Sequence, residues 1–171
     1  MKLAHPLRRS GLITAFVLAL VSAALTGCSD REHAPTLNYT LLDGSQHSTA
    51  ALKGRVVLIN FWATTCTTCV KEIPHLVEAY QRLHPQGLEA LSVAMSYDKL
   101  DYITEFTRAR QLPYPVTFDR NGELAQGFGK VQITPTTFVL NKKGDIIKRF
   151  VGEPDYAQLD ALLKELLAER V

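Results

Sequence analysis

Two cysteines placed just after a long apolar run are the feature that most restricts the folds open to this chain. The run VVLINFWA occupies Val56 to Ala63, and the sequence TCTTC follows at Thr65 to Cys69. An apolar run without alternation predicts a strand buried on both faces, as in the middle of a mostly parallel sheet. We predict that this strand leads into a helix that starts near Cys66, so that the first thiol lies at the helix N-terminus.

A thiol at a helix N-terminus has chemistry that an ordinary surface thiol lacks. Unpaired helix N–H groups and the positive end of the helix dipole favour thiolate over thiol. Such surroundings lower a cysteine pKa from about 8.5 to between roughly 3.5 and 7.5. The spacing of three residues also brings Cys69 within reach of Cys66, so the pair is able to alternate between dithiol and disulfide. The pattern therefore predicts a redox site.

The first residues are typical of an export signal rather than of a membrane-spanning helix. Met1–Ser10 contains three basic residues and no acid, and the apolar run that follows at Leu12–Ala24 is shorter than the about 20 residues that span a bilayer. The run ends in LTGC at Leu25–Cys28, which resembles the bacterial lipobox, in which the cysteine is lipidated. Two alternatives stay open: an ordinary cleaved signal with a coincidental cysteine, and twin-arginine export through Arg8 and Arg9.

These features predict three parts of the chain. We expect a lipoprotein signal peptide at residues 1–27, a polar tether at 28–36 that begins with the lipidated Cys28, and one folded domain at 37–171. Acyl chains on Cys28 would hold the protein to a membrane. Cys66 and Cys69 would then be the only thiols of the mature domain.

The slightly basic charge of the chain arises from its leader. The 19 Lys and Arg residues exceed the 17 Asp and Glu residues, but three of the basic residues precede the predicted cleavage site. The remaining chain is close to neutral and shows no basic face typical of nucleic-acid binding. We therefore expect no nucleic-acid partner.

The sequence beyond the leader alternates strand-like and helix-like segments. Strands are predicted at 38–42, 56–61, 88–95, a short stretch ending at 118, 136–140 and 146–151. Helices are predicted at 66–83, 98–111, 123–128 and from 154 onward, where leucines recur at i, i+3, i+4, i+7 and i+8. Alternating β and α segments, followed by a hairpin and a final helix, predict a layered α/β sandwich with a mixed sheet.

Together these residues resemble a known family. The buried strand, the CxxC pair and Pro74 are similar to the active-site strand and helix of the thioredoxin fold, and ITPTTF at Ile133–Phe138 is similar to its cis-proline segment. The extra segment at 98–118, the N-terminal strands and Glu72 narrow the resemblance to the TlpA/ResA group of membrane-anchored, extracytoplasmic thiol-disulfide oxidoreductases. The resemblance extends from about Leu37 to the C-terminus.

The resemblance implies both a fold and an activity. The implied fold is a thioredoxin-like three-layer α/β/α sandwich with a mixed central sheet, an N-terminal strand extension and an αβ insertion around residues 98–118. The implied protein is a monomeric, cofactor-free enzyme that faces the periplasm as a lipoprotein of the bacterial cell envelope. Its partners would be protein thiols and disulfides, which it would reduce, and a membrane thiol conduit that recharges it. Apocytochrome c is one substrate of similar proteins.

The resemblance also assigns roles at the redox site. Cys66 is expected to be the nucleophile, and Cys69 the thiol that resolves the mixed disulfide. Glu72 is expected beneath the disulfide, where burial would raise its pKa toward neutrality and suit it to proton exchange with Cys69. The alternative is a solvated acid that stabilises the first turn of the helix. Thioredoxins hold a buried aspartate where this chain has Asn60, and its absence favours the first role.

Four residues are expected to contact substrate. General statistics favour a trans bond before proline, but the resemblance implies a cis Thr134–Pro135 bond, with the Thr134 backbone pairing with an extended substrate segment. Trp62 is either a core aromatic or a ring that partly shields the disulfide. Thr65 stands where many relatives carry tryptophan, so the apolar rim beside Cys66 is reduced.

Two other functions stay open on the residues alone. A soft-metal carrier, for example for copper, could use the two cysteines as ligands. No second CxxC and no nearby methionine or histidine completes such a site, so we predict no metal. A thiol-dependent peroxidase would need a threonine three residues before its cysteine, and this chain has Ala63 there.

Overall fold

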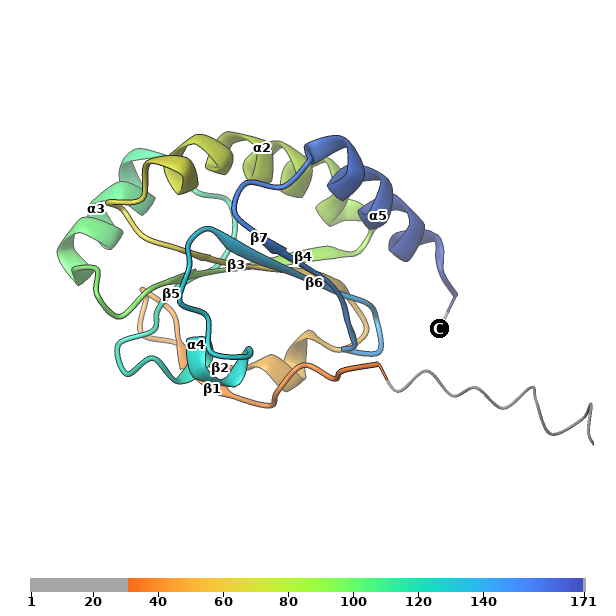
Figure 1. Cartoon of the computed structure of the whole chain (residues 1–171), viewed down its shortest axis with the longest axis horizontal. Helices are drawn as coiled ribbons and strands as arrows, with labels where there is room; N and C mark the ends of the chain where they lie inside the picture. The colour runs from red at the N-terminus through yellow and green to blue at the C-terminus, as the bar shows by residue number, and fades with distance from the viewer. Residues whose placement is uncertain (1–30, 171) are drawn as a thin grey trace, which may run out of the picture. The chain divides into compact units, whose positions relative to one another are not determined.

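The computed structural model describes residues 31–170, which are built around a five-stranded mixed sheet (Figure 1). The strands are β3 (Val56–Trp62), β4 (Leu88–Ala94), β5 (Val116–Phe118), β6 (Thr136–Leu140) and β7 (Ile146–Val151). They lie in the order β5-β4-β3-β6-β7. β3, β4 and β5 are parallel, whereas β6 is antiparallel to β3 and β7 is antiparallel to β6. The predicted mixed sheet is therefore confirmed.

The central strand β3 is covered on both faces. All seven of its residues are buried, because one face packs against a layer of helices and the other against the N-terminal hairpin and a short helix. This burial explains why its sequence is continuously apolar rather than alternating.

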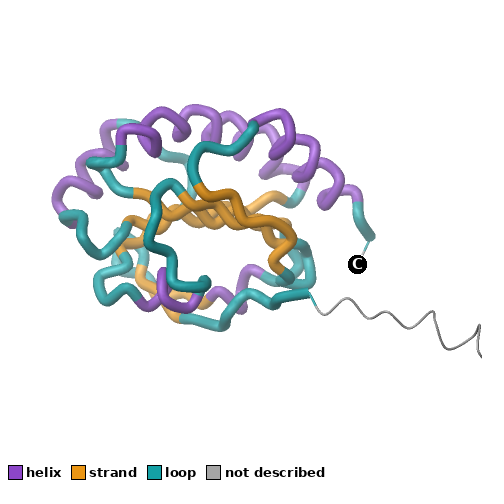
Figure 2. The backbone as a smooth tube through the Cα atoms, in the orientation of Figure 1, coloured by secondary structure: helices purple, strands orange, loops and turns teal. Residues whose placement is uncertain are grey.

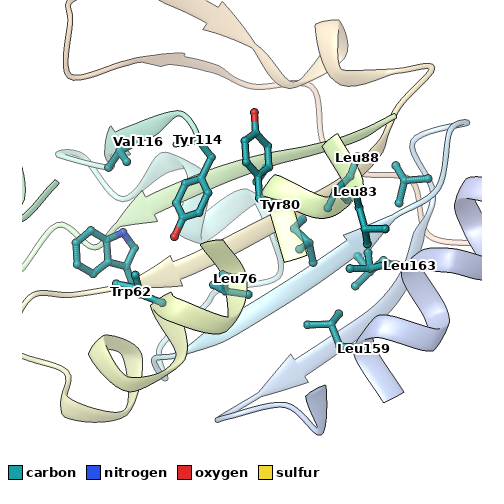
Figure 3. Close-up of a cluster of buried hydrophobic side chains, with 14 of the residues drawn as sticks. Trp62, Leu76, Tyr80, Leu83, Leu88, Tyr114, Val116, Leu159 and Leu163 are labelled. Atoms are coloured by element: carbon teal, nitrogen blue, oxygen red, sulfur yellow. The ribbon is translucent and has the colours of Figure 1, made fainter. Parts of the chain in front are cut away.

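Three long helices cover one face of the sheet (Figures 1 and 2). They are α2 (Thr67–Leu83), which continues into the 3₁₀ turn η3 (His84–Gln86), α3 (Leu100–Ala109) and α5 (Tyr156–Ala168). The predicted leucine stripe of α5 points inward, since Leu159, Leu163 and Leu166 are buried. Figure 3 shows part of the apolar cluster that these helices form with the sheet.

The opposite face is covered by smaller elements. They are the antiparallel strands β1 (Asn38–Thr40) and β2 (Gln46–Ser48), the 3₁₀ turn η2 (Thr49–Leu52) and the short helix α4 (Glu123–Gly127). A Cβ atom at Gly127 would lie 2.5 Å from Leu37 Cδ1, so any other residue there would displace the end of that leucine side chain. The predicted three-layer arrangement is confirmed.

The N-terminal hairpin is joined to the edge of the main sheet. The Leu42 N–H donates to the Val116 carbonyl at 3.1 Å, and Thr117 Oγ1 donates to the Thr40 carbonyl at 2.7 Å. The predicted N-terminal strand extension is thereby confirmed, although β2 was not predicted. Its three polar residues show no apolar alternation that would reveal a strand.

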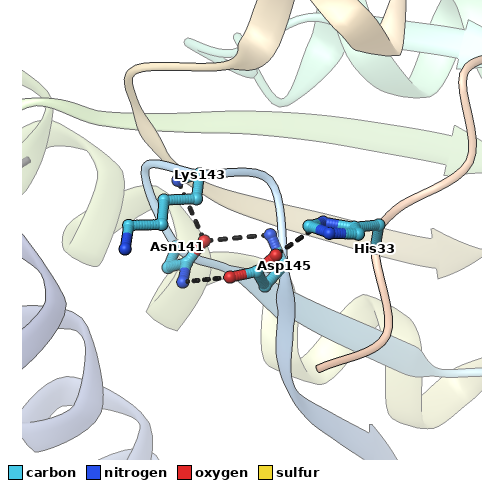
Figure 4. A network of polar contacts seen from close by, with 4 residues as sticks. All are labelled: His33, Asn141, Lys143 and Asp145. Atoms are coloured by element: carbon cyan, nitrogen blue, oxygen red, sulfur yellow. Dashed lines mark hydrogen bonds and ion pairs between the residues drawn. The ribbon is translucent and has the colours of Figure 1, made fainter. Parts of the chain in front are cut away.

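The chain enters the domain through contacts with the β6–β7 hairpin. His33 Nδ1 lies 2.6 Å from Asp145 Oδ1, and the amide of Asn141 donates to the other Asp145 oxygen at 2.9 Å (Figure 4). Backbone hydrogen bonds join Glu32 to Ile146 and Ala34 to the same hairpin. Residues 32–34, which the sequence analysis assigned to the tether, are therefore bound to the folded domain.

Two sequence predictions concern residues outside the part of the chain that the structure describes. The signal peptide at 1–27 and the lipidation of Cys28 lie outside residues 31–170. No helix among the described residues is long and apolar enough to cross a membrane. The helix predicted from residue 98 begins at Leu100, because the Asp98 carboxylate accepts hydrogen bonds from Thr64, in the turn after β3, instead of starting the helix.

Candidate active site

Cys66 stands at the start of helix α2, just beyond the carboxyl end of β3. Its Sγ accepts the N–H of Cys69 at 3.2 Å, and its carbonyl accepts the N–H of Val70 at 3.0 Å. The two cysteines form a disulfide, in which Cys66 is partly exposed and Cys69 fully buried. After reduction, the same N–H group and the helix dipole would stabilise a Cys66 thiolate. The site can therefore exchange disulfides through Cys66.

The turn that leads from β3 to Cys66 is fixed by a residue that the sequence analysis missed. The carboxylate of Asp98 accepts the Thr64 N–H at 2.6 Å and the Thr64 hydroxyl at 2.8 Å. Asp98 follows β4, which is parallel to β3, and the carboxyl ends of parallel neighbours meet at one edge of a sheet. No local signal identified it, because an acid in the loop between β4 and α3 is equally typical of a helix-capping residue.

The Thr134–Pro135 bond is cis, as predicted, and lies beside the disulfide-bearing turn. The β3–β6 register pairs Phe61 with Thr136. The two residues that precede β6 therefore lie opposite the residues that lead from β3 to Cys66. Pro135 is buried and Thr134 is half-buried. Backbone groups at this point therefore border the site.

Tyr97 contacts the same segment. Its hydroxyl lies 3.0 Å from Thr134 Oγ1, and its side chain is 60% exposed. Thr65, the residue before Cys66, is exposed as well. The exposed rim of the site thus includes a tyrosine that the sequence analysis did not single out, in addition to the predicted Thr65.

Glu72 is fully buried on helix α2, three residues beyond Cys69 and so on the same side of the helix. Its Oε1 accepts the amide N–H of Asn60 at 2.5 Å, and the same amide donates to Thr137 Oγ1 at 3.0 Å. Among residues 31–170, Oε2 of Glu72 finds no hydrogen-bond partner. The alternative of a solvated acid at the helix surface is therefore wrong.

The surroundings of Glu72 favour its neutral form. Burial raises the pKa of Glu72 to about 7, although the Asn60 hydrogen bond lowers it in part and the nearby charge of Glu153 raises it further. A carboxyl group that titrates near neutrality can both accept and release a proton at physiological pH. Such a group beneath a disulfide suits proton exchange with the inner cysteine.

Trp62 belongs to the core rather than to the substrate surface. Its side chain has no exposed area, and its ring packs against Phe106 at a centroid distance of 5.1 Å. It shares an apolar cluster with Cys69. A fully buried ring offers no surface to a docking protein, so the expected substrate contact of Trp62 is corrected to a core contact.

The described part of the chain contains no group of three or more His, Cys, Asp and Glu side chains able to hold a metal ion. The chemistry that the described site can perform with its own residues is sulfur exchange and proton transfer.

Comparisons with known proteins agree with this geometry. The model of the Redoxin family matches residues 30–163. The thiol-disulfide oxidoreductase ResA of Bacillus thuringiensis subsp. konkukian is 32% identical over 136 residues, which cover 79% of this chain and 77% of that protein. ResA of Bacillus subtilis is 28% identical over 151 residues, which cover 84% of this chain and 83% of that protein.

A solved structure supports the same conclusion about the fold. The thiol:disulfide interchange protein of the thioredoxin family from Chlorobium tepidum superposes with a TM-score of 0.74 at 28% identity. The match covers 82% of this chain and 99% of that chain. The fold is therefore thioredoxin-like, as predicted.

The buried Glu72 carboxyl makes the stability of the oxidised protein depend on pH. In the unfolded chain this carboxyl titrates near 4.5, whereas burial raises its pKa to about 7 in the folded protein. Between these values the folded protein holds a proton that the unfolded chain has lost. We therefore expect the free energy of unfolding to fall by a few kcal/mol as the pH rises through this window.

Urea unfolding followed by circular dichroism between pH 5 and pH 8 measures this dependence. The Glu72→Gln variant should lack this fall, and Glu78→Gln, which removes an exposed acid from the same helix, should retain it. Parallel curves for the unsubstituted protein and Glu72→Gln would contradict the expectation.

Proposed function

Because the chain belongs to the Redoxin family and is a thiol-disulfide oxidoreductase, we propose that it is a lipid-anchored enzyme of the bacterial envelope that reduces the disulfides of other proteins. The observation that carries the proposal is the Cys66–Cys69 disulfide at the N-terminus of α2 with the buried Glu72 one helical turn further on. A reductase needs an accessible thiolate that attacks the substrate disulfide and a second thiol that resolves the mixed disulfide. This arrangement supports both requirements.

The reaction begins with the dithiol form. The Cys66 thiolate attacks one sulfur of the substrate disulfide, forms a mixed disulfide and releases the first substrate thiolate. Cys69 then gives its proton to Glu72 and attacks Cys66 Sγ, which forms the intramolecular disulfide and releases the second substrate thiolate. Two electrons pass from the dithiol to the substrate. Burial of Cys69 supports its role as the resolving thiol, because partners reach only Cys66.

The substrate would lie along the segment that precedes β6. An extended segment of the partner would pair with the backbone at Thr134, beside the cis Pro135. The exposed Thr65 would form the other border of the contact, and its small side chain leaves Cys66 open to approach. This surface is suited to an extended chain around a disulfide rather than to a small enclosed ligand.

The location follows from the leader of the sequence. A basic start, a short apolar run and the LTGC sequence ending at Cys28 support export and lipidation. A lipid anchor would keep the enzyme at a membrane facing the periplasm. There a membrane thiol conduit would return electrons to the Cys66–Cys69 disulfide, which the reducing direction requires.

The direction of electron flow is tested by the reduction potential of the Cys66–Cys69 couple, measured by equilibration with thiol buffers. We expect a value nearer to the about −270 mV of a reducing thioredoxin than to the about −120 mV of a strong periplasmic oxidant. The reduced protein should also cleave the disulfides of insulin. A potential near −120 mV would overturn the reducing role.

Replacement of the resolving cysteine should trap the partners. In Cys69→Ser the mixed disulfide at Cys66 has no internal thiol to release it, so covalent adducts should accumulate in cells and disappear on treatment with dithiothreitol. Cys66→Ser is the matched control, because it removes the attacking thiol and should form no such adducts. Equal adduct patterns from the two variants would contradict the assignment of Cys66 as the nucleophile.

Lipidation is tested on the full chain produced in bacteria supplied with an alkyne-tagged fatty acid. The unsubstituted protein should carry the tag and sediment with membranes, whereas Cys28→Ser should carry none. Absence of the tag from the unsubstituted protein would rule out the lipid anchor and leave the redox proposal intact.

A further inference from the structure

Buried polar atoms near the inner cysteine stand without hydrogen-bond partners. Among the residues that the structure describes, these atoms include Glu72 Oε2, the Tyr114 hydroxyl and Trp62 Nε1. Trp62 and Tyr114 belong to the same apolar cluster as Cys69. The indole N–H is a donor only, and the phenol is a donor as well as an acceptor. Unpartnered buried groups of this kind are rare and costly, so each calls for an explanation.

Tyr114 reaches this region from the segment before β5. Its side chain is 6% exposed, and its ring meets that of Tyr80 edge-on at a centroid distance of 5.6 Å. Figure 3 shows that its hydroxyl points away from the Tyr80 hydroxyl, into the part of the cluster where Trp62 lies. The Tyr80 hydroxyl is already used, since it donates to Glu89 at 3.3 Å.

A small cavity joins Tyr114 to the partner of Glu72. It has a volume of about 10 Å³, close to the lower limit for one water molecule. Its lining is almost wholly apolar, and the residues among it that carry polar side chains are Tyr114, Asn60 and Ser92. Asn60 also donates to Glu72 Oε1, so a single amide separates the carboxyl group of Glu72 from the space that Tyr114 borders.

We propose that Tyr114 is a positioning residue for Glu72, whose free oxygen accepts a hydrogen bond from the Tyr114 hydroxyl whenever Glu72 is ionised. The inference rests on the proton-accepting role proposed for Glu72. In the resolving step, the Cys69 proton passes to Glu72, and Glu72 later releases it to solvent. Before and after this transfer, Glu72 is a buried carboxylate, and Asn60 donates a hydrogen bond to only one of its oxygens. Tyr114 stabilises the carboxylate by donating to the other oxygen.

Tyr114 acts as a donor and does not itself lose a proton. Burial, and then the charge of Glu72, raise the pKa of Tyr114 above its ordinary value. Asn60 on β3 bonds to Glu72. The titratable groups whose charge interacts with that of Glu72 come from the segment before β5, the loop before α5 and the start of α5, and they are Tyr114, Glu153 and Tyr156. The Tyr156 hydroxyl already donates to Glu153 at 3.0 Å, which leaves Tyr114 as the phenol with an unused donor.

The test compares Tyr114→Phe with Tyr80→Phe, a matched control that removes a hydroxyl from the ring packed against it. The reduced proteins react with a chromogenic aromatic disulfide, and the second of the two coloured thiolates released reports the attack by Cys69. Without the Tyr114 hydroxyl, ionised Glu72 loses a donor, so the midpoint of the pH–rate profile should rise by about one pH unit. Tyr80→Phe should leave the midpoint unchanged.

A second measurement is independent of catalysis. In the oxidised protein, the ¹³C signal of the Glu72 carboxyl should titrate near pH 7, and its midpoint should rise in Tyr114→Phe but not in Tyr80→Phe. Fluorotyrosine incorporated into the unsubstituted chain makes the phenol a stronger donor and should lower the same midpoint. A purely structural role of Tyr114 would change rates or melting temperature without moving either midpoint.

The outcomes separate this inference from the proposed function. If Glu72→Gln leaves the pH–rate profile unchanged, the proton-accepting role of Glu72 fails, and this inference fails with it. If Glu72→Gln removes the midpoint but Tyr114→Phe leaves both midpoints in place, the inference about Tyr114 alone is overturned. A shift in Tyr114→Phe that disappears in the Glu72→Gln background supports it.

Discussion

The hydrogen bond from Asn60 to Glu72 connects the elements on which the site depends. Asn60 lies on β3, which leads to the cysteines, and Glu72 lies on α2, which carries them. The same amide donates to Thr137 on β6, within the cis-proline segment. An aspartate at position 60 would set two carboxyl groups against each other, and one would stay protonated. A neutral amide leaves a single titrating acid under the disulfide.

The sequence was most informative where local pattern and burial coincide. The continuous apolar run of β3 and the cysteine spacing predicted a strand, a turn and a helix, and the structure has them at nearly the same residues. Burial of Glu72 was inferred only from resemblance, because a charged residue is not expected on the apolar face of a helix, where Glu72 lies one turn before Leu76. Trp62 at the end of β3 was ambiguous, and its packing against Phe106 decides that it belongs to the core.

The residue pattern could not predict contacts between distant parts of the chain. Asp98 holds a loop 34 positions earlier in the sequence, and nothing local distinguishes it from a helix-capping acid. Its neighbour Tyr97 contacts Thr134. One short loop after β4 thus touches both the turn before Cys66 and the segment before Pro135, and it fixes the two sides of the site relative to each other.

The entry of the chain into the domain has a consequence for access. His33 contacts Asp145 in the turn between β6 and β7, and the β3–β6 register places that turn at the beginning of β3. Cys66 follows the end of the same strand. The first described residues therefore lie at the end of β3 opposite the sulfur atoms, so a protein that docks at Cys66 does not have to contact His33 or its neighbours.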